Sequence, residues 1–222
     1  MTIMIGARCK DGVVLVSDRR LVRAGGLELQ SPECKLRAVR GVLIGAVGMS
    51  AFYDTVERLL MSKFPDSTVL ATAWDIAELA DEVVKQYEGL KDDRPFFPVL
   101  DRVNGKARLW QVTAGLPPGE MDYEVWGRSE AYGAIGRLFP WQETPMETGW
   151  RVMLFFVAIA AKVSFSVGDG VDVGLGGDDT DSIEIKHYLQ PRDSSVFNTY
   201  EKAKRLVETL PQFITDGICR SD

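Results

Sequence analysis

The sequence predicts an α+β fold in which two β-sheets stack face to face and helices cover the outer side of each sheet. A group of strand-like segments is followed by two helical segments, and this order repeats before the final strands. Strand groups that alternate with helix pairs are typical of two packed sheets with a helical layer outside each. The chain of 222 residues is 45% hydrophobic and 26% charged, so we expect residues 1–222 to form one globular domain.

The first twenty residues predict a β-hairpin. Ile3 and Ile5 belong to a stretch in which apolar residues recur at the period of two that a strand requires. An Asp-Gly pair at residues 11–12 favours a tight turn, and the apolar run at 13–16 is typical of a strand covered on both faces. Asp18 ends this second strand. A carboxylate buried there is costly unless it is paired, so Asp18 requires a cation nearby.

The remaining elements follow from hydrophobic periodicity and turn residues. Two short strands meet at Arg40-Gly41, and a helical stripe begins at Ser50, the expected N-cap, and ends before Pro65. Asn104-Gly105 is a strong hairpin signal. In chain order, we expect strands at 36–39 and 42–48, helices at 50–64 and 71–87, strands at 96–103, 107–112 and 123–126, helices at 129–138 and 146–163, strands at 171–175 and 182–188, and a helix at 195–210.

Composition excludes several classes of protein. A net charge of −6 argues against nucleic acid as the main partner. The longest apolar run, at 152–161, is too short to span a bilayer and is typical of a buried helix, so we expect no membrane association. The N-terminus shows no secretory leader, which favours a cytoplasmic protein.

Cysteine and histidine content argues against metal and disulfide sites. The three cysteines, Cys9, Cys34 and Cys219, have no metal-binding spacing and indicate a reducing compartment. His187 is the one histidine, and no nucleophile motif accompanies it, so we interpret it as a strand residue and not as a catalytic base. We therefore expect no metal ion and no organic cofactor.

Thr2 is the candidate nucleophile. It follows the initiator Met, and a threonine there is small enough for that Met to be trimmed. Trimming leaves a hydroxyl and a free α-amine on one residue, and the unperturbed pKa of an α-amine is about 7.7–8.0. The neutral amine accepts a proton near pH 7, and this pairing of threonine with its own amine is an established way to activate a nucleophile.

The stretch from Thr2 to Arg20, the pair Lys35-Leu36, the glycines at 45 and 48 and the order of the elements together resemble the β-type subunits of the proteasome. These subunits are N-terminal-nucleophile hydrolases. The resemblance implies a four-layer αββα sandwich and a threonine peptidase without a cofactor. It also implies a peptide or protein substrate and a homo-oligomeric ring or other proteasome-like subunits as partners. The element order can be followed along nearly the whole chain, whereas the motifs match only in the first fifty residues.

The resemblance assigns roles to four residues. Thr2 matches the nucleophile, Lys35 matches a lysine beside its hydroxyl, and Asp18 matches the acid that orients this lysine. This assignment supplies the cation that Asp18 requires. A lysine at that place helps to remove the hydroxyl proton, and desolvation lowers the pKa of such a lysine. Gly45, or Gly48 in a competing alignment, matches the loop whose backbone N–H forms the oxyanion hole.

Two stretches depart from the family pattern. Where the family has a Ser-Gly pair after the sixth strand, this chain has an arginine, and Ser129 comes one place later. Where the family has an Asp and then a Ser after the long helix, an ungapped alignment places Ser164 and Val167. Asp169 takes the role of the family Asp only if the loop shifts. The surroundings of the Thr2 amine are therefore expected to differ from those of proteasomes.

Alternatives remain open at this point. If an amine and not water attacks the acyl enzyme, the protein is a transpeptidase or ligase that resembles the connectases. A non-catalytic ring subunit would retain Met1, and Asp18 and Lys35 would then be a structural ion pair. A weaker alternative is an amidase for small-molecule amides. Arg19 and Arg20 are interpreted as structural partners of carboxylates.

Overall fold

The computed structural model describes residues 3–22, 28–30, 34–47, 50–66, 68–87, 94–127, 136–163, 170–180, 182–187 and 194–218. Two five-stranded sheets dominate it, and every strand pair within them is antiparallel. The first has the order β10-β1-β2-β11-β12, and the second has the order β5-β6-β7-β8-β9. A separate two-stranded sheet, β3-β4, follows the first hairpin.

The first sheet consists of β1 (Ile3–Cys9), β2 (Gly12–Asp18), β10 (Tyr123–Gly127), β11 (Val171–Gly177) and β12 (Ile183–His187). The second consists of β5 (Leu36–Val39), β6 (Val42–Gly45), β7 (Phe96–Val103), β8 (Lys106–Thr113) and β9 (Gly119–Glu120). The small sheet pairs β3 (Arg20–Val22) with β4 (Glu28–Gln30). The helical segments are α1 (Ser50–Lys63), α2 (Ala73–Gln86), η2 (Trp141–Glu143), α4 (Met146–Val163) and α5 (Ser194–Ile218).

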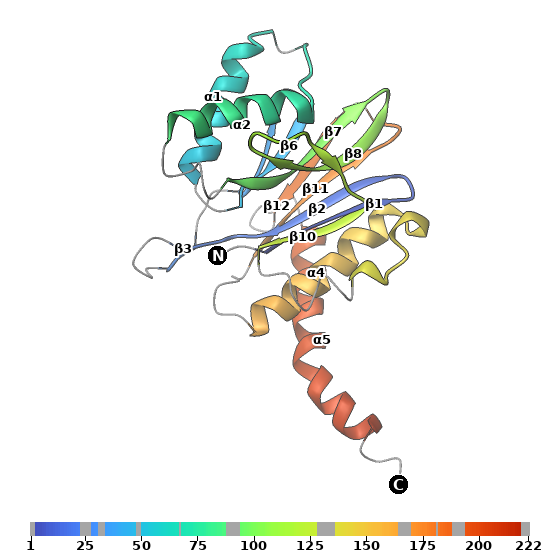
Figure 1. Cartoon of the computed structure of the whole chain (residues 1–222). Helices are drawn as coiled ribbons and strands as arrows, with labels where there is room; N and C mark the ends of the chain where they lie inside the picture. Colours follow the sequence, from blue (N-terminus) through green and yellow to red (C-terminus); the bar gives the residue numbers. More distant parts are fainter. Residues whose placement is uncertain are drawn as a thin grey trace.

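Three separate hydrophobic cores define four layers (Figure 1). The first core joins α1 and α2 to the outer face of the second sheet, through residues such as Phe52 and Val99. The middle core lies between the sheets and contains Met4 and Leu43. The third core joins the outer face of the first sheet to α4 and α5. The predicted αββα sandwich is therefore confirmed.

Strand alternation explains why a single hairpin serves two cores. In β1, Ile3 and Ile5 belong to the core beneath α4, whereas Met4 belongs to the core between the sheets. In β2, Val14 and Leu15 divide in the same way. Because successive side chains of a strand point to opposite faces, a strand in the interior of this sandwich is apolar on both faces. The run at 13–16 was interpreted in this way from the sequence.

Local turn and cap chemistry sets the element boundaries. Asn104 and Gly105 both have positive φ, at 54° and 77°, which is the backbone of a tight hairpin turn between β7 and β8.

The helix expected at 71–87 starts later, at Ala73, because Thr72 is its N-cap. The Thr72 hydroxyl accepts the Asp75 N–H at 3.4 Å, and the Asp75 carboxylate accepts the Thr72 N–H at 3.0 Å. This reciprocal capping box ends the preceding loop.

The other helices agree with the sequence prediction to different extents. The helix expected at 146–163 is found over that range, and the tail helix continues to Ile218, beyond the expected residue 210. Most of the helix expected at 129–138 lies outside the described residues. No helix among the described residues has the length and apolar character needed to cross a membrane.

Candidate functional site

Asp18 lies at the end of β2, where its carboxylate joins two parts of the chain. Its side chain is fully buried, and Oδ1 accepts the backbone N–H of Ile3 at 3.0 Å and the Lys35 Nζ at 2.7 Å. The Ile3 N–H belongs to the peptide bond that links residues 2 and 3. The carboxylate therefore lies between the first residue of β1 and Lys35. Both contacts are charge-assisted hydrogen bonds, which are stronger than neutral ones.

Lys35 lies immediately before β5, in the second sheet. Its side chain is 3% exposed, so the ion pair with Asp18 is closed off from water. The Lys35 carbonyl accepts the N–H of Ala46 at 2.8 Å, which ties the lysine backbone to the end of β6. The site is thus built from the ends of β1, β2, β5 and β6, and the Asp18–Lys35 contact connects the two sheets. The cation that the sequence analysis required for Asp18 is Lys35.

Gly45 is the last residue of β6, directly opposite Leu36 in β5, and it is buried. A Cβ atom at this position would lie 2.2 Å from the Met4 Sδ and 2.6 Å from the Pro98 Cγ. Packing alone therefore requires glycine here. Because Ala46 donates to the Lys35 carbonyl, the backbone around Gly45 lies beside the ion pair.

A second buried ion pair lies next to the first. The Arg19 guanidinium donates to Asp172 Oδ1 at 2.8 Å, and both side chains are at most 7% exposed. Arg19 was interpreted as the partner of a carboxylate, and this carboxylate is Asp172. Asp172 was not among the predicted site residues. The signal for it was present, since an acid inside the apolar strand at 171–175 requires a buried cation.

Three predicted site residues, Thr2, Ser129 and Asp169, lie outside the described residues, and so does Gly48, the competing oxyanion residue. The structure thus brings together Asp18, Lys35 and the backbone around Gly45, next to the peptide that follows Thr2.

The described residues offer neither a metal site nor a reactive Cys9 thiol. Within the described ranges, no group of three or more His, Cys, Asp or Glu side chains is arranged to hold a metal ion. Cys9 and Cys34 are free thiols. Burial raises the pKa of Cys9 to about 12, so this thiol stays protonated and unreactive at neutral pH.

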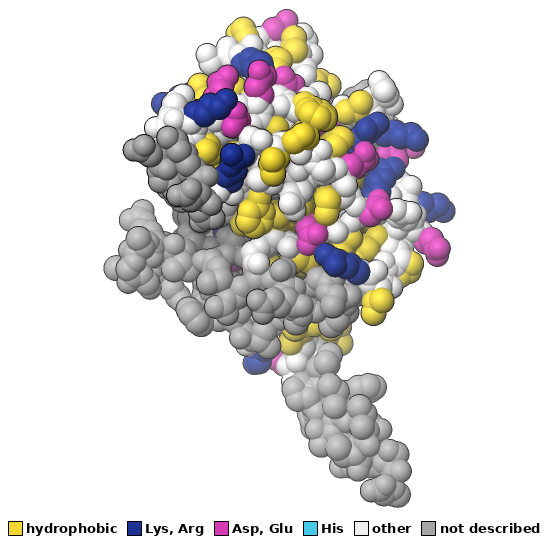
Figure 2. All heavy atoms as spheres, in the orientation of Figure 1, with side chains coloured by type: hydrophobic (Ala, Val, Ile, Leu, Met, Phe, Trp, Pro, Cys, Tyr) yellow, Lys and Arg dark blue, Asp and Glu magenta, His cyan; other side chains and the backbone are white. Residues whose placement is uncertain are grey.

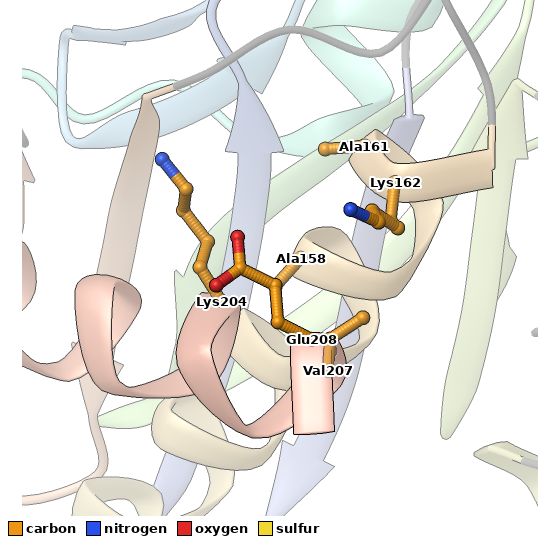
Figure 3. A pocket seen from close by; sticks show the side chains of 6 residues that line it. All are labelled: Ala158, Ala161, Lys162, Lys204, Val207 and Glu208. Atoms are coloured by element: carbon orange, nitrogen blue, oxygen red, sulfur yellow. The ribbon is translucent and has the colours of Figure 1, made fainter. Parts of the chain in front are cut away.

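A pocket of about 100 Å³ lies at the junction of α4 and α5 (Figure 3). It is lined by Ala158, Ala161, Lys162, Lys204, Val207 and Glu208. None of these residues belongs to the strand ends that carry Asp18 and Lys35. We therefore do not assign this pocket to the candidate site.

Solved structures with the same architecture provide an independent comparison. A Gly-1 mutant of Anbu from Hyphomicrobium sp. strain MC1 superposes with a TM-score of 0.76 and 16% identity, over 96% of this chain and 97% of that one. Anbu, an ancestral β-subunit, from Yersinia bercovieri superposes with a TM-score of 0.72 and 18% identity, over 95% of this chain and 97% of that one. The chain has a proteasome-like fold. A helical assembly of the Anbu complex from Pseudomonas aeruginosa also has a TM-score of 0.72 and 18% identity, over 95% of this chain and 96% of that one.

Sequence comparisons add no closer relationship. No protein-family model matches the chain, and no curated protein is detectably similar to it in sequence. At 16–18% identity, the solved structures show that the chain has the same four-layer fold as Anbu, and not that it has an activity.

Proposed function

We propose that the protein is a threonine-type peptidase or amidohydrolase whose nucleophile is Thr2 after removal of Met1. One observation carries this proposal. The buried Asp18 carboxylate binds both the peptide N–H that follows Thr2 and the Lys35 ammonium group. One carboxylate oxygen of Asp18 thus accepts hydrogen bonds from both Lys35 and the backbone N–H of Ile3, the residue that follows Thr2. A nucleophile oriented by neighbouring polar groups is the general arrangement of covalent catalysis.

The proposed reaction passes through an acyl enzyme. The Thr2 hydroxyl adds to the substrate carbonyl carbon, and its proton passes to the neutral α-amine of the same residue. The Lys35 ammonium group, held 2.7 Å from Asp18 Oδ1, stabilises the negative charge that develops on the Thr2 oxygen. The C–N bond breaks, the leaving amine takes up the proton, and an ester remains on Thr2. Water then attacks the ester, which releases the acid and restores the hydroxyl.

Gly45 is assigned a positioning and stabilising role in the same proposal. We assign its backbone N–H to the oxyanion that forms on the substrate carbonyl. A single donor of this kind contributes about 3 kcal/mol to transition-state stabilisation. Ser129 and Asp169 remain candidates for groups that tune the Thr2 amine, as the family resemblance implies.

Assembly and location complete the proposal. Anbu from Pseudomonas aeruginosa forms a helical assembly, and we propose that this chain likewise assembles from copies of itself or with proteasome-like subunits. The free thiols of Cys9 and Cys34 agree with a reducing compartment such as the cytoplasm. On the face shown in Figure 2, basic and acidic side chains are intermixed, with no extended basic surface for nucleic acid. Sedimentation velocity over a range of protein concentrations tests the assembly.

The deciding experiment is intact mass spectrometry before and after incubation with a peptide epoxide or a β-lactone directed at threonine. We expect loss of Met1 and one covalent adduct on residue 2, and no adduct in Thr2→Ala. A protein that retains Met1 and forms no adduct overturns the proposal and favours a non-catalytic ring subunit. If the adduct forms, adding a peptide amine to a peptide substrate separates hydrolysis from the connectase-like transfer, because transfer yields a ligated product.

A further inference from the structure

Five residues form a closed ring around the candidate site. Two links are covalent, since Asp18 precedes Arg19 and Cys34 precedes Lys35. Three links are non-covalent: the hydrogen bond from Lys35 Nζ to Asp18 Oδ1 at 2.7 Å, the hydrogen bond from Arg19 to Asp172 Oδ1 at 2.8 Å, and the electrostatic contact between the Cys34 side chain and the Asp172 carboxylate. The ring crosses from the first sheet to the second and back. Asp172 is its one charged member that neither the family resemblance nor the proposed reaction uses.

The Cys34 thiol connects Asp172 to the lysine. Burial raises the pKa of Cys34, and the negative charge of Asp172 raises it further, so the thiol keeps its proton beside the carboxylate. The same sulfur accepts the N–H of Leu36 at 3.3 Å. Cys34 and Leu36 flank Lys35, and this contact closes a tight turn around it. Asp172 therefore lies beside the residue that precedes Lys35.

The strand register holds Asp172 relative to Asp18. Asp172 lies directly opposite Ser17 in β2, and Val171 lies opposite Asp18. The Arg19 N–H donates to the carbonyl of Gly170 at 3.2 Å, which extends the pairing beyond the strand. Asp172 thus occupies a position set by the backbone ladder that also carries Asp18. The same ladder therefore fixes the distance between Asp172 and the acid that binds Lys35.

We propose that Asp172 is a positioning residue that holds Lys35 against Asp18, and that it also balances the charge of the ring. This inference rests on the proposed function, since it concerns the same site. The ring contains two acids, Asp18 and Asp172, and two bases, Arg19 and Lys35, so its formal charge is zero. Loss of Asp172 would leave an excess positive charge next to the reacting groups.

The experiment compares Asp172→Asn with the wild type in two ways. The first is the kinetics of covalent labelling of residue 2 by the peptide epoxide, measured over a pH series and resolved into a maximal rate and an apparent affinity. The second is a crystal structure of each protein, in which the Lys35 Nζ to Asp18 separation is read directly. Asp101→Asn is the matched control. Asp101 is also fully buried and accepts two hydrogen bonds, from the Ala73 N–H and the Trp110 indole, on the side of the second sheet that faces α2.

We expect Asp172→Asn to lower the maximal labelling rate by about tenfold or more, with little change in apparent affinity, because misplacement of a reacting group acts on the chemical step. The acidic limb of the pH profile shifts to lower pH, because removing a negative charge disfavours the protonated form of any amine in the site. Lys35 Nζ moves away from Asp18 in the crystal structure. Asp101→Asn keeps the wild-type maximal rate, pH profile and geometry.

Each contrary outcome has a distinct meaning. A wild-type protein that is labelled, together with an Asp172→Asn variant that has the same rate and pH profile, overturns this inference and leaves the proposed function intact. A wild-type protein that is not labelled overturns the proposed function. The crystal structures then still test the positioning, and an unchanged Lys35–Asp18 contact refutes it. If Asp172→Asn does not fold, Cys34→Ala removes the same link from the other side, and an unchanged labelling rate in that variant refutes the inference.

Discussion

Replacing Lys35 by methionine tests how much the buried ion pair with Asp18 stabilises the fold. The apolar side chain of Lys35→Met fills similar space, but the fully buried Asp18 carboxylate loses the ammonium group that now lies 2.7 Å away. Removing one partner of a buried pair typically costs about 3–5 kcal/mol. For a chain of this length, each kcal/mol changes Tm by about 2–4 °C, so we expect a fall of about 6–20 °C.

The assay is thermal unfolding followed by circular dichroism at one fixed protein concentration. Lys85→Met is the matched control, because Lys85 pairs with Asp81 at 2.5 Å on the surface, with the lysine 71% exposed. Exposed pairs contribute little, so this variant is expected to unfold close to the wild-type temperature. The double variant Asp18→Asn/Lys35→Met is expected to be less destabilised than the sum of the two single variants, since it leaves no isolated charge. A Tm for Lys35→Met within about 2 °C of wild type would refute the reasoning.

Three further changes test packing, pH dependence and capping. Gly45→Ala should lower the free energy of unfolding by about 1–3 kcal/mol, because the added Cβ has no room. Gly119→Ala is the control, since the space around its added Cβ is open, and it should leave the free energy of unfolding unchanged. Urea unfolding of both variants measures the difference. The hydrogen bond from Arg8 lowers the pKa of Asp178, so the stability that this pair contributes is present above the unfolded pKa of about 3.9 and is lost as pH falls below it. In Asp178→Asn, the decrease in Tm between neutral and acidic pH should accordingly be smaller. Thr72→Ala should cost about 1 kcal/mol through loss of the α2 cap, also measured in urea, and an unchanged midpoint would argue against the capping box.

Much of the fold could be predicted because turn residues and periodicity act locally. Asn104-Gly105 defines a hairpin whatever surrounds it, since both residues have to adopt positive φ. The apolar helix at 146–163 was recognisable for a similar reason, because its composition leaves it no alternative to burial. The start of α2 was placed two residues too early. There the Thr72 side chain caps the helix by accepting the Asp75 N–H, so the helix begins only at the next residue. The hydrophobic pattern alone carries no information about this hydrogen bond.

Part of the site could also be predicted from a local argument. Asp18 closes a strand buried on both faces, so its carboxylate had to find a cation, and Lys35 was the candidate that the family resemblance supplied. Gly45 was predicted for its backbone N–H. The structure adds a second reason for glycine, because the Met4 sulfur and the Pro98 ring occupy the space of a side chain. That reason depends on how the two sheets pack and has no local sequence signal.

Asp172 shows where sequence reasoning stops. The same argument that demanded a cation for Asp18 applies to an acid within the strand at 171–175, so a partner could be required but not named. Its partner, Arg19, lies 153 residues away in the sequence and becomes a neighbour only because β11 pairs with β2. A pair joined by sheet topology becomes visible only when the strand order is known. Once the order is known, the two buried ion pairs lie side by side through Asp18 and Arg19, and the site extends from a single acid and lysine to a neutral ring of four charges.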